Sequence, residues 1–309
     1  MTPPLEPARR PARLRAGDTV ALVAPSGPVP PDLLDAALPV LHGWGVKVRV
    51  GAGVRRQPGA PAYLAASDED RAAEFTEAWL DPEVRSVLAA RGGYGAQRMV
   101  DLVDWSALSA VEPKVLAGSS DVTAVHRAVH TRLGLSTLFS PMPASVLFDE
   151  VAAEHLRRTL FEPEHTRVLR AREPDVLVSG CASGLLVGGN LSLLAAGIGT
   201  PEQGCARDGI VLLEDVTESV YRIDRMLTQL LRSGWFAGVR GIVLGSWAAC
   251  GDPAEIRNLV AERLTPLGVP MLSGFGFGHV ASSPTVPLGV TAALDTELAT
   301  LTLDSPALG

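Results

Sequence analysis

The first segment that could carry chemistry is Gly118-Ser119-Ser120-Asp121, which follows the apolar residues 115–117. Apolar residues at helical spacing come next, so the segment predicts a tight turn from a buried strand into a helix. A serine on such a turn is lifted out of the sheet, and the amide of the following residue can stabilise an oxyanion. The pattern is not the Gly-x-Ser-x-Gly of an esterase. A plain Ser/Asp cap of the helix is the alternative interpretation.

Two further segments contain a carboxylate pair and a histidine. The apolar strand predicted over 209–215 ends in Glu214 and Asp215, ahead of an amphipathic helix predicted over 219–231. A carboxylate at this position could orient a histidine, or it could cap that helix, and the residues alone favour neither. His279 follows a run of glycines, where the backbone can be approached closely. The alternative there is an exposed histidine in a flexible loop.

The patterns for metal and nucleotide sites are incomplete. His126 and His130 are four residues apart on a predicted helix, but Arg127 stands where a zincin has its glutamate. The three cysteines include no Cys-x-x-Cys pair. The loose dinucleotide fingerprint over 276–281 is not followed by a helix, and the glycine-rich run 91–95 lacks the lysine of a phosphate loop. We therefore expect neither a metal nor a cofactor.

Composition excludes several classes of protein. The chain has 309 residues, of which 47% are hydrophobic and 20% charged, so it can bury a core and is not disordered. A net charge of −7 gives no basic field for nucleic acid. The uncharged stretch 176–201 contains six glycines and is a poor membrane helix. Few cysteines and no apolar run behind the early arginines predict a cytoplasmic location without a signal peptide.

The elements that must position these residues alternate between strand and helix. Up to about residue 145 this alternation predicts an α/β fold with a mostly parallel sheet flanked by helices. The predicted elements are strands over 19–24, 46–50, 84–90 and 115–117, a helix over 32–44, and a helix capped by Ser67. We expect a first domain over 1–150, a charged linker over 151–175 and a second, strand-rich domain over 176–309. Ligands of such sheets bind at the carboxyl ends of the strands.

Taken in order, these segments resemble the LD-carboxypeptidase family of serine peptidases. This family includes muramoyltetrapeptide carboxypeptidases and, as a branch, microcin C immunity peptidases. The likeness extends from about Leu14 to Leu294, and each motif is weak alone but specific in this order. The motifs lie at residues 14–28, 63–65, 67–71, 91–95, 118–123, 188–191, 213–225, 278–279 and 285–289.

The resemblance implies a Ser-Glu-His triad in that chain order. Matched residue by residue, Ser120 is the nucleophile, Glu214 the carboxylate and His279 the base. Ser119 stands where the family usually has an aromatic residue, so two serines are adjacent, and the following Asp-x-Thr favours Ser120. Glu218 is a weaker alternative to Glu214.

The resemblance also implies an oxyanion hole and an architecture. The oxyanion donors would be backbone amides of Asp121 and of the turn at Gly92 and Gly93. The fold would have a flavodoxin- or Rossmann-like N-terminal layer and a smaller, swivelling, β-rich C-terminal domain that completes the triad. The implied assembly is a homodimer.

The implied activity is release of the terminal D-Ala from an L,D bond of cytoplasmic murein tetrapeptides. The partner is then a small peptide, with no nucleic acid and no membrane. One alternative is hydrolysis of an acyl-sulfamate or peptide-nucleotide antibiotic, as in the microcin C branch, with Trp235, Phe236 and Trp247 as candidates for an adenine pocket. Another is a non-catalytic ligand-binding relative, which is considered because Ser119 departs from the family pattern.

Overall fold

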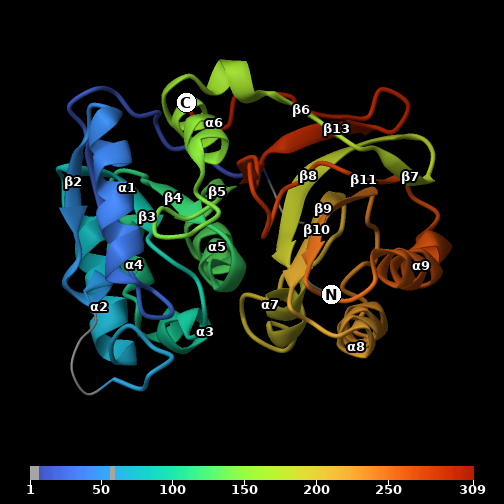
Figure 1. The fold of residues 1–309 in the computed structure, drawn as a ribbon, viewed down its shortest axis with the longest axis horizontal. Helices are drawn as coiled ribbons and strands as arrows, with labels where there is room; N and C mark the ends of the chain where they lie inside the picture. Colours follow the sequence, from blue (N-terminus) through green and yellow to red (C-terminus); the bar gives the residue numbers. More distant parts are fainter. Residues whose placement is uncertain (1–6, 56–59) are drawn as a thin grey trace.

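The computed structural model describes residues 7–55 and 60–309, whose strands form two sheets that lie side by side (Figure 1). The first sheet has six strands in the order β12-β5-β4-β3-β1-β2. The bounds of its strands are β1 Thr19–Val23, β2 Lys47–Val50, β3 Val84–Ala89, β4 Val115–Gly118, β5 Thr137–Phe139 and β12 Val286–Leu288. Strands β1 to β5 run parallel, and their order is that of a flavodoxin-like sheet.

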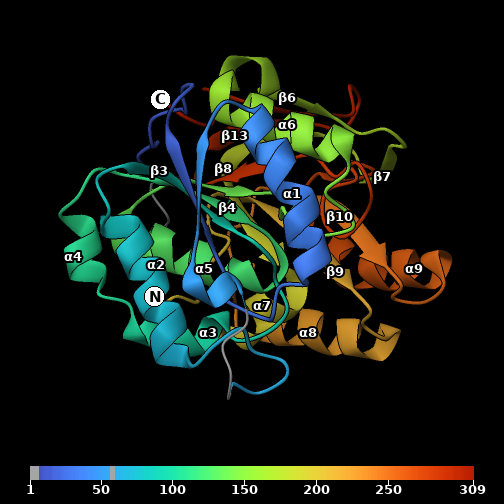
Figure 2. The same cartoon turned by 60° about the vertical axis from the view of Figure 1, so that its left-hand side comes forward.

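Helices cover both faces of the first sheet (Figure 2). Successive side chains of a strand point to opposite faces. Accordingly, Val20 and Leu22 of β1 pack in the same hydrophobic cluster as α1, whereas Ala21 and Val23 pack with α2 and α5. Ser67 caps α2 by accepting the N–H of Asp70. The helices of this half are α1 Pro31–Gly43, α2 Asp68–Leu80, α3 Ala96–Met99, α4 Trp105–Ser109 and α5 Thr123–Ala128.

The second sheet has eight strands in the order β6-β14-β13-β8-β9-β10-β11-β7. Strands β8 to β11 are parallel neighbours, and antiparallel strands flank them. The strands are β6 Val168–Arg170, β7 Asp175–Val178, β8 Cys181–Asn190, β9 Gly209–Val216, β10 Gly241–Ala248, β11 Met271–Ser273, β13 Thr291–Asp295 and β14 Thr300–Leu303. One face carries α7 Leu191–Ala196, α8 Val220–Arg232 and α9 Pro253–Leu264 (Figure 1).

The two halves share strands and a core. Strand β12 comes from the C-terminal part of the chain but pairs with β5 of the first sheet. Leu212 of β9 lies in the same hydrophobic cluster as Leu22 of β1. The charged segment expected as a linker over 151–175 contains most of α6 Glu150–Phe161, which buries Leu156 and Leu160, and it contains β6, which pairs with β14.

The fold class predicted from the alternation of strands and helices is confirmed. Both sheets direct the carboxyl ends of their parallel strands to the residues that the sequence singles out: Ser120 follows β4, and Glu214 lies near the end of β9. Within residues 7–55 and 60–309, no helix combines the length and apolar character needed to cross a membrane.

Candidate active site

Ser120 occupies a strained turn at the carboxyl end of β4. Its φ is +59°, a left-handed backbone conformation that is uncommon for a residue other than glycine and that costs free energy. A short 3-10 turn over Ser120–Val122 leads into α5. Ser119 is buried, with 6% of its surface exposed, whereas Ser120 is partly exposed. Of the two adjacent serines, only Ser120 therefore combines accessibility with this strained turn.

The glycine turn after β3 lies directly against Ser120. A Cβ atom placed on Gly92 would be 3.0 Å from the Ser120 Cβ atom and 3.3 Å from its Oγ atom. Gly93 has a φ of +117°, which L side chains rarely adopt. The N–H of Gly27 donates to the carbonyl of Gly92 at 3.1 Å. Close approach thus favours glycine at position 92, and backbone conformation favours it at position 93.

His279 and Glu214 form a partly buried hydrogen bond at the edge of the second sheet. The distance from His279 Nδ1 to Glu214 Oε2 is 2.7 Å, and the Glu214 side chain is 0% exposed. An ionised carboxylate only accepts, so Nδ1 carries the hydrogen of a neutral His279 and Nε2 is left as the basic nitrogen. Glu218, the weaker alternative, has its Oε2 atom 3.6 Å from Arg222 Nη1. Within residues 7–55 and 60–309, no hydrogen bond or ion pair joins it to His279.

The loop that carries His279 is fixed by its backbone. The N–H of His279 donates to Ser246 Oγ at 2.9 Å, and the N–H of Gly278 donates to Ser283 Oγ at 3.0 Å. A Cβ atom on Gly278 would be 2.6 Å from Glu214 Oε2. The absence of a side chain at Gly278 therefore lets the carboxylate reach the imidazole.

Asn190 connects this pair to the rest of the site, a role that sequence reasoning missed. Its Nδ2 atom donates to Glu214 Oε1 at 3.1 Å and to Asp215 Oδ1 at 3.0 Å. Its backbone N–H donates to Thr123 Oγ1 at 3.1 Å, three residues after Ser120. The motif at 188–191 contains Asn190, but its sequence alone does not indicate what this residue does. Asn190 thus joins the edges of the two sheets.

The structure places Ser120, Glu214 and His279 along the boundary between the two sheets, here called the seam. It completes only part of the predicted triad. In the part of the chain that the structure describes, no hydrogen bond joins Ser120 Oγ to His279. Catalytic hydrogen bonds are commonly long without substrate and tighten in the complex. Two of the predicted contacts are present: Glu214 is hydrogen-bonded to His279, and Gly92 lies against Ser120.

The charges around His279 favour its protonated form. Burial opposes protonation, but the hydrogen bond and charge of Glu214, with the charge of Asp215, outweigh burial and raise the pKa of His279 above its ordinary value. Burial, assisted by the charge of Glu214, raises the pKa of Asp215 to about 6. Such an environment stabilises an imidazolium, which is the species that forms when a histidine accepts a proton from serine.

The two helical histidines do not form a metal centre. Among the described residues, no cluster of three or more His, Cys, Asp and Glu side chains has the geometry to hold a metal ion. His126 is buried, and its Nε2 lies 2.9 Å from the carbonyl of Gly118 at the end of β4. Burial lowers the pKa of both His126 and His130 to about 4. His126 therefore supports the strand that leads into Ser120.

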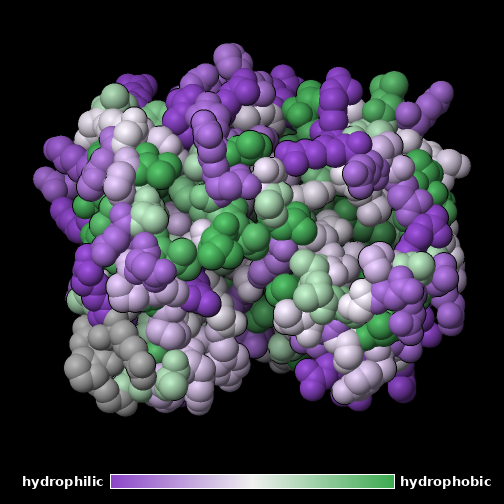
Figure 3. Space-filling model, in the orientation of Figure 1, coloured by the Kyte–Doolittle hydropathy of each residue, from purple (hydrophilic) through white to green (hydrophobic). Residues whose placement is uncertain are grey.

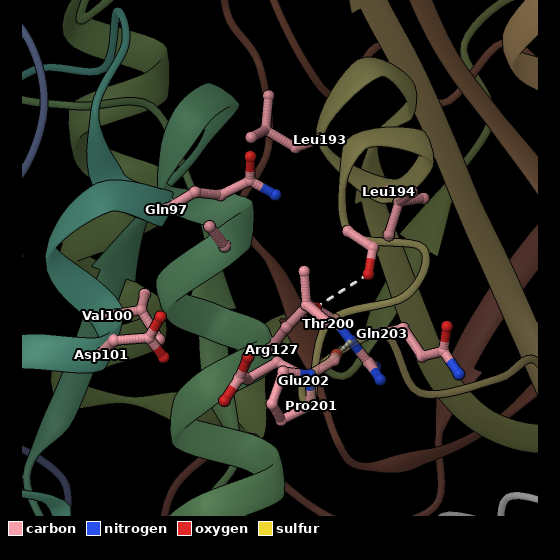
Figure 4. A pocket seen from close by; sticks show the side chains of 12 residues that line it. Gln97, Val100, Asp101, Arg127, Leu193, Leu194, Thr200, Pro201, Glu202 and Gln203 are labelled. Carbon is pink, nitrogen blue, oxygen red and sulfur yellow. Dashed lines mark hydrogen bonds between the residues drawn. The ribbon is translucent and has the colours of Figure 1, made fainter.

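A cavity of about 120 Å³ lies between α5 and α7, and Figure 4 shows residues that line it. Its lining includes Leu193 and Leu194 of α7 and Ala124 of α5. Figure 3 shows that the two halves of the molecule are hollowed at the lower edge of this seam. Trp235 and Phe236, candidates for an adenine pocket, are each 2% exposed and pack edge-on in the core under α8 and α9.

Two family models match most of the chain. The LD-carboxypeptidase N-terminal domain matches residues 20–140, and the LD-carboxypeptidase C-terminal domain matches residues 183–294. The chain belongs to the LD-carboxypeptidase family. This result confirms the resemblance that the motifs indicated. The family consists of carboxypeptidases, which are hydrolases.

Relatives in the LD-carboxypeptidase family match along nearly the whole chain. A protein of Streptomyces coelicolor, provisionally named a carboxypeptidase, is 54% identical over 97% of this chain and 97% of its own. The murein tetrapeptide carboxypeptidase of Pseudomonas aeruginosa is 31% identical over 89% of this chain and 92% of its own.

Solved structures of the LD-carboxypeptidase family have the same fold. The muramoyltetrapeptide carboxypeptidase of Oxalobacter formigenes has a TM-score of 0.78 at 28% identity, covering 93% of this chain and 99% of its own. The microcin C7 self-immunity protein has a TM-score of 0.86 at 21% identity, covering 97% of this chain and 100% of its own. The second likeness concerns the fold alone.

Proposed function

We propose that this protein is a metal-independent serine carboxypeptidase that releases the terminal D-Ala from an L,D bond of murein tetrapeptides. The observation that carries the proposal is the partly buried hydrogen bond of 2.7 Å between His279 and Glu214, on the same seam as the strained turn of Ser120. A serine hydroxyl is a weak nucleophile until an adjacent base takes its proton. The arrangement supplies a base, a carboxylate that orients it and an accessible serine.

The proposed reaction starts with attack of Ser120 Oγ on the carbonyl of the L-residue. His279 accepts the hydroxyl proton at Nε2, while Glu214 holds the Nδ1–H and stabilises the imidazolium. The amide of Asp121 and the Gly92–Gly93 turn donate to the oxyanion. His279 then protonates the leaving amine, which departs as D-Ala, and water hydrolyses the acyl-enzyme with His279 again as base.

The choice of a murein peptide as substrate is supported by the relatives. The P. aeruginosa protein is named a murein tetrapeptide carboxypeptidase, and the O. formigenes structure is named a muramoyltetrapeptide carboxypeptidase. Both align over most of this chain. The antibiotic-hydrolase alternative receives less support, because two of its three candidates, Trp235 and Phe236, lie in the core and cannot stack on a base. The third candidate, Trp247, is partly exposed. The homodimer and the cytoplasmic location remain predictions.

Release of D-Ala from a tetrapeptide that ends in an L,D bond tests the proposal. We expect the wild type to release D-Ala equally with and without a chelator, and Ser120→Ala to lose on the order of 10³-fold or more in kcat, because triad members act as a unit. Ser119→Ala is the matched control and should stay within tenfold of wild type. No release by the wild type, or full activity of Ser120→Ala, would refute the proposal.

The same assay compares this reaction with the alternatives. An aminoacyl-sulfamoyl adenosine offered beside the tetrapeptide should be hydrolysed at least a hundredfold more slowly. Faster turnover of the nucleotide substrate would assign the protein to the antibiotic-hydrolase alternative. If neither substrate is hydrolysed, the non-catalytic binding relative becomes the better description.

A further inference from the structure

Arg71 is a buried arginine that lies behind the glycine turn. Its side chain is 0% exposed, and its Nη2 atom pairs with Asp68. Its Nη1 atom donates to two backbone carbonyls, those of Pro25 and of Gly95, the latter at 2.8 Å. Pro25 belongs to the loop after β1, and Gly95 closes the turn after β3. One guanidinium group therefore ties together two loops at the carboxyl edge of the first sheet.

Asp121 holds the same turn from the side of Ser120. Its side chain is buried, with 2% of the residue exposed, and Oδ2 accepts the N–H of Ala96 at 2.7 Å. The N–H of Ala96 and the C=O of Gly95 belong to one peptide group. Arg71 thus binds the carbonyl end of this planar group and Asp121 binds its N–H end. Because the group is rigid, two hydrogen bonds at opposite ends fix its orientation.

The structure leads us to infer that Arg71 and Asp121 are positioning residues for the oxyanion turn. The inference rests on the proposed function, in which the Gly92–Gly93 turn donates to the oxyanion. The Arg71 bond to Pro25 fixes the loop in which the N–H of Gly27 donates to Gly92. The peptide clamped between Arg71 and Asp121 fixes the turn on its other side. The turn is therefore anchored both before and after its donor.

Misplacement of this turn should affect the transition state more than substrate binding. An oxyanion donor acts on a charge that develops only during reaction, and removing one such donor lowers kcat by about 10²–10³-fold. A shift of about 1 Å in a positioned group can lower the rate about 10²-fold. Loss of Arg71, whose side chain is buried, should therefore lower kcat with little change in KM.

The test uses Arg71→Met, with Lys114→Met as a matched control. Lys114 is also buried, at 3% exposure, and also donates to backbone carbonyls, those of Asp81 and Val84. Both variants remove a buried cation and should lower the melting temperature. We expect only Arg71→Met to lower kcat, by about 10–100-fold with KM within threefold. It should also weaken binding of a tripeptide boronic acid, in which boron replaces the attacked carbonyl carbon of the L-residue, by a similar factor while binding of the product tripeptide is unchanged.

Asp121 supplies the conservative comparison. Asp121→Asn keeps an oxygen that can accept from Ala96 and should retain at least a tenth of kcat, whereas Asp121→Ala should fall to the level of Arg71→Met. If Arg71→Met and Lys114→Met have the same kcat and the same boronic acid affinity, the clamp is refuted even though the enzyme works. If the wild type neither releases D-Ala nor binds the boronic acid, the proposed function fails as well.

Amide hydrogen exchange reports on the clamp without any substrate. The peptide covering residues 91–96 should exchange at least tenfold faster in Arg71→Met than in wild type, because the Ala96 N–H loses its fixed partner geometry. In Lys114→Met its exchange should follow only the global loss of stability. Unchanged protection of this peptide in Arg71→Met would overturn the inference, whatever the substrate of the enzyme is.

Discussion

The two sheets contribute to the candidate site in different ways. The edge of the first sheet contributes mainly backbone: the strained turn of Ser120 and the glycines that lie against it. The edge of the second contributes polar and ionisable side chains, with Glu214, His279 and Asn190 joined by hydrogen bonds. The comparison teaches that one region depends on conformation and close approach, and the other on the balance of buried charge.

The largest predicted effect breaks the charged region. Glu214→Gln should lower kcat by about 10⁴-fold, because the neutral amide no longer stabilises the imidazolium or fixes its tautomer. Release of D-Ala at saturating tetrapeptide measures the change. Glu218→Gln, four residues away, should lose at least a hundredfold less. Equal losses in the two variants would contradict the assignment of Glu214 as the partner of His279.

A single methyl group tests the backbone region. Gly92→Ala should lower kcat by about 10²-fold, because the added Cβ would lie 3.0 Å from the Ser120 Cβ atom and 3.2 Å from the Met142 side chain, so the turn must shift. Gly43→Ala is the matched control, since among the described residues no atom outside its own helix backbone and chain neighbours lies within 4 Å of the added methyl. Activity of Gly92→Ala close to wild type would show that the turn does not need this close contact.

Stability at low pH probes the support beneath Ser120. The pKa of His126 is lowered from 6.5 to about 4 by burial, so the unfolded state binds the proton first as pH falls. The free energy of unfolding should therefore decrease between pH 6.5 and pH 4, by up to about 3 kcal/mol for this residue. Urea unfolding measures it at several pH values. His126→Gln should show a shallower decrease, and an identical slope would contradict the prediction.

The smallest predicted effect is a change in the pKa of His279 in the charged region. Asp215 is one of the charges that raise the pKa of His279, so Asp215→Asn should move the acidic limb of kcat/KM to lower pH, by less than one unit. The reason is that His279 must be neutral to act as a base, and it stays neutral to lower pH when a nearby negative charge is removed. The control Asp295→Asn should leave the limb in place. A limb that moves to higher pH would contradict the electrostatic account.

Much of the fold could be predicted from local sequence patterns. The apolar run at 19–24 and the Ser67 cap correspond to β1 and α2, because strand burial and helix capping depend on neighbouring residues. The pairing of β12 with β5 could not be predicted, because it joins segments about 150 residues apart. In the charged segment over 151–175, the many charged residues obscure the fact that α6 has a buried face. Only the helical spacing of Leu156 and Leu160 indicates this face.

The candidate site divides in the same way. Ser120, Glu214 and His279 are expected from the order of the family motifs. The approach of Gly92 to Ser120 and the hydrogen bond between His279 and Glu214 depend on the assembled fold. Arg71 was hidden, because an arginine among acidic residues is typical of a solvated helix face. Its buried position follows from carbonyls of two loops that converge only in the folded chain.

The central claim is that Ser120 Oγ, activated by His279, is the nucleophile that forms a covalent acyl-enzyme. Rapid acid quench of the enzyme with an L,D-tetrapeptide, followed by mass spectrometry of its proteolytic fragments, tests it most directly. The account predicts a tripeptidyl ester on Ser120 that forms in the wild type and in Ser119→Ala and is absent from Ser120→Ala. An ester on Ser119, or turnover of the tetrapeptide by Ser120→Ala at the wild-type rate, would contradict it.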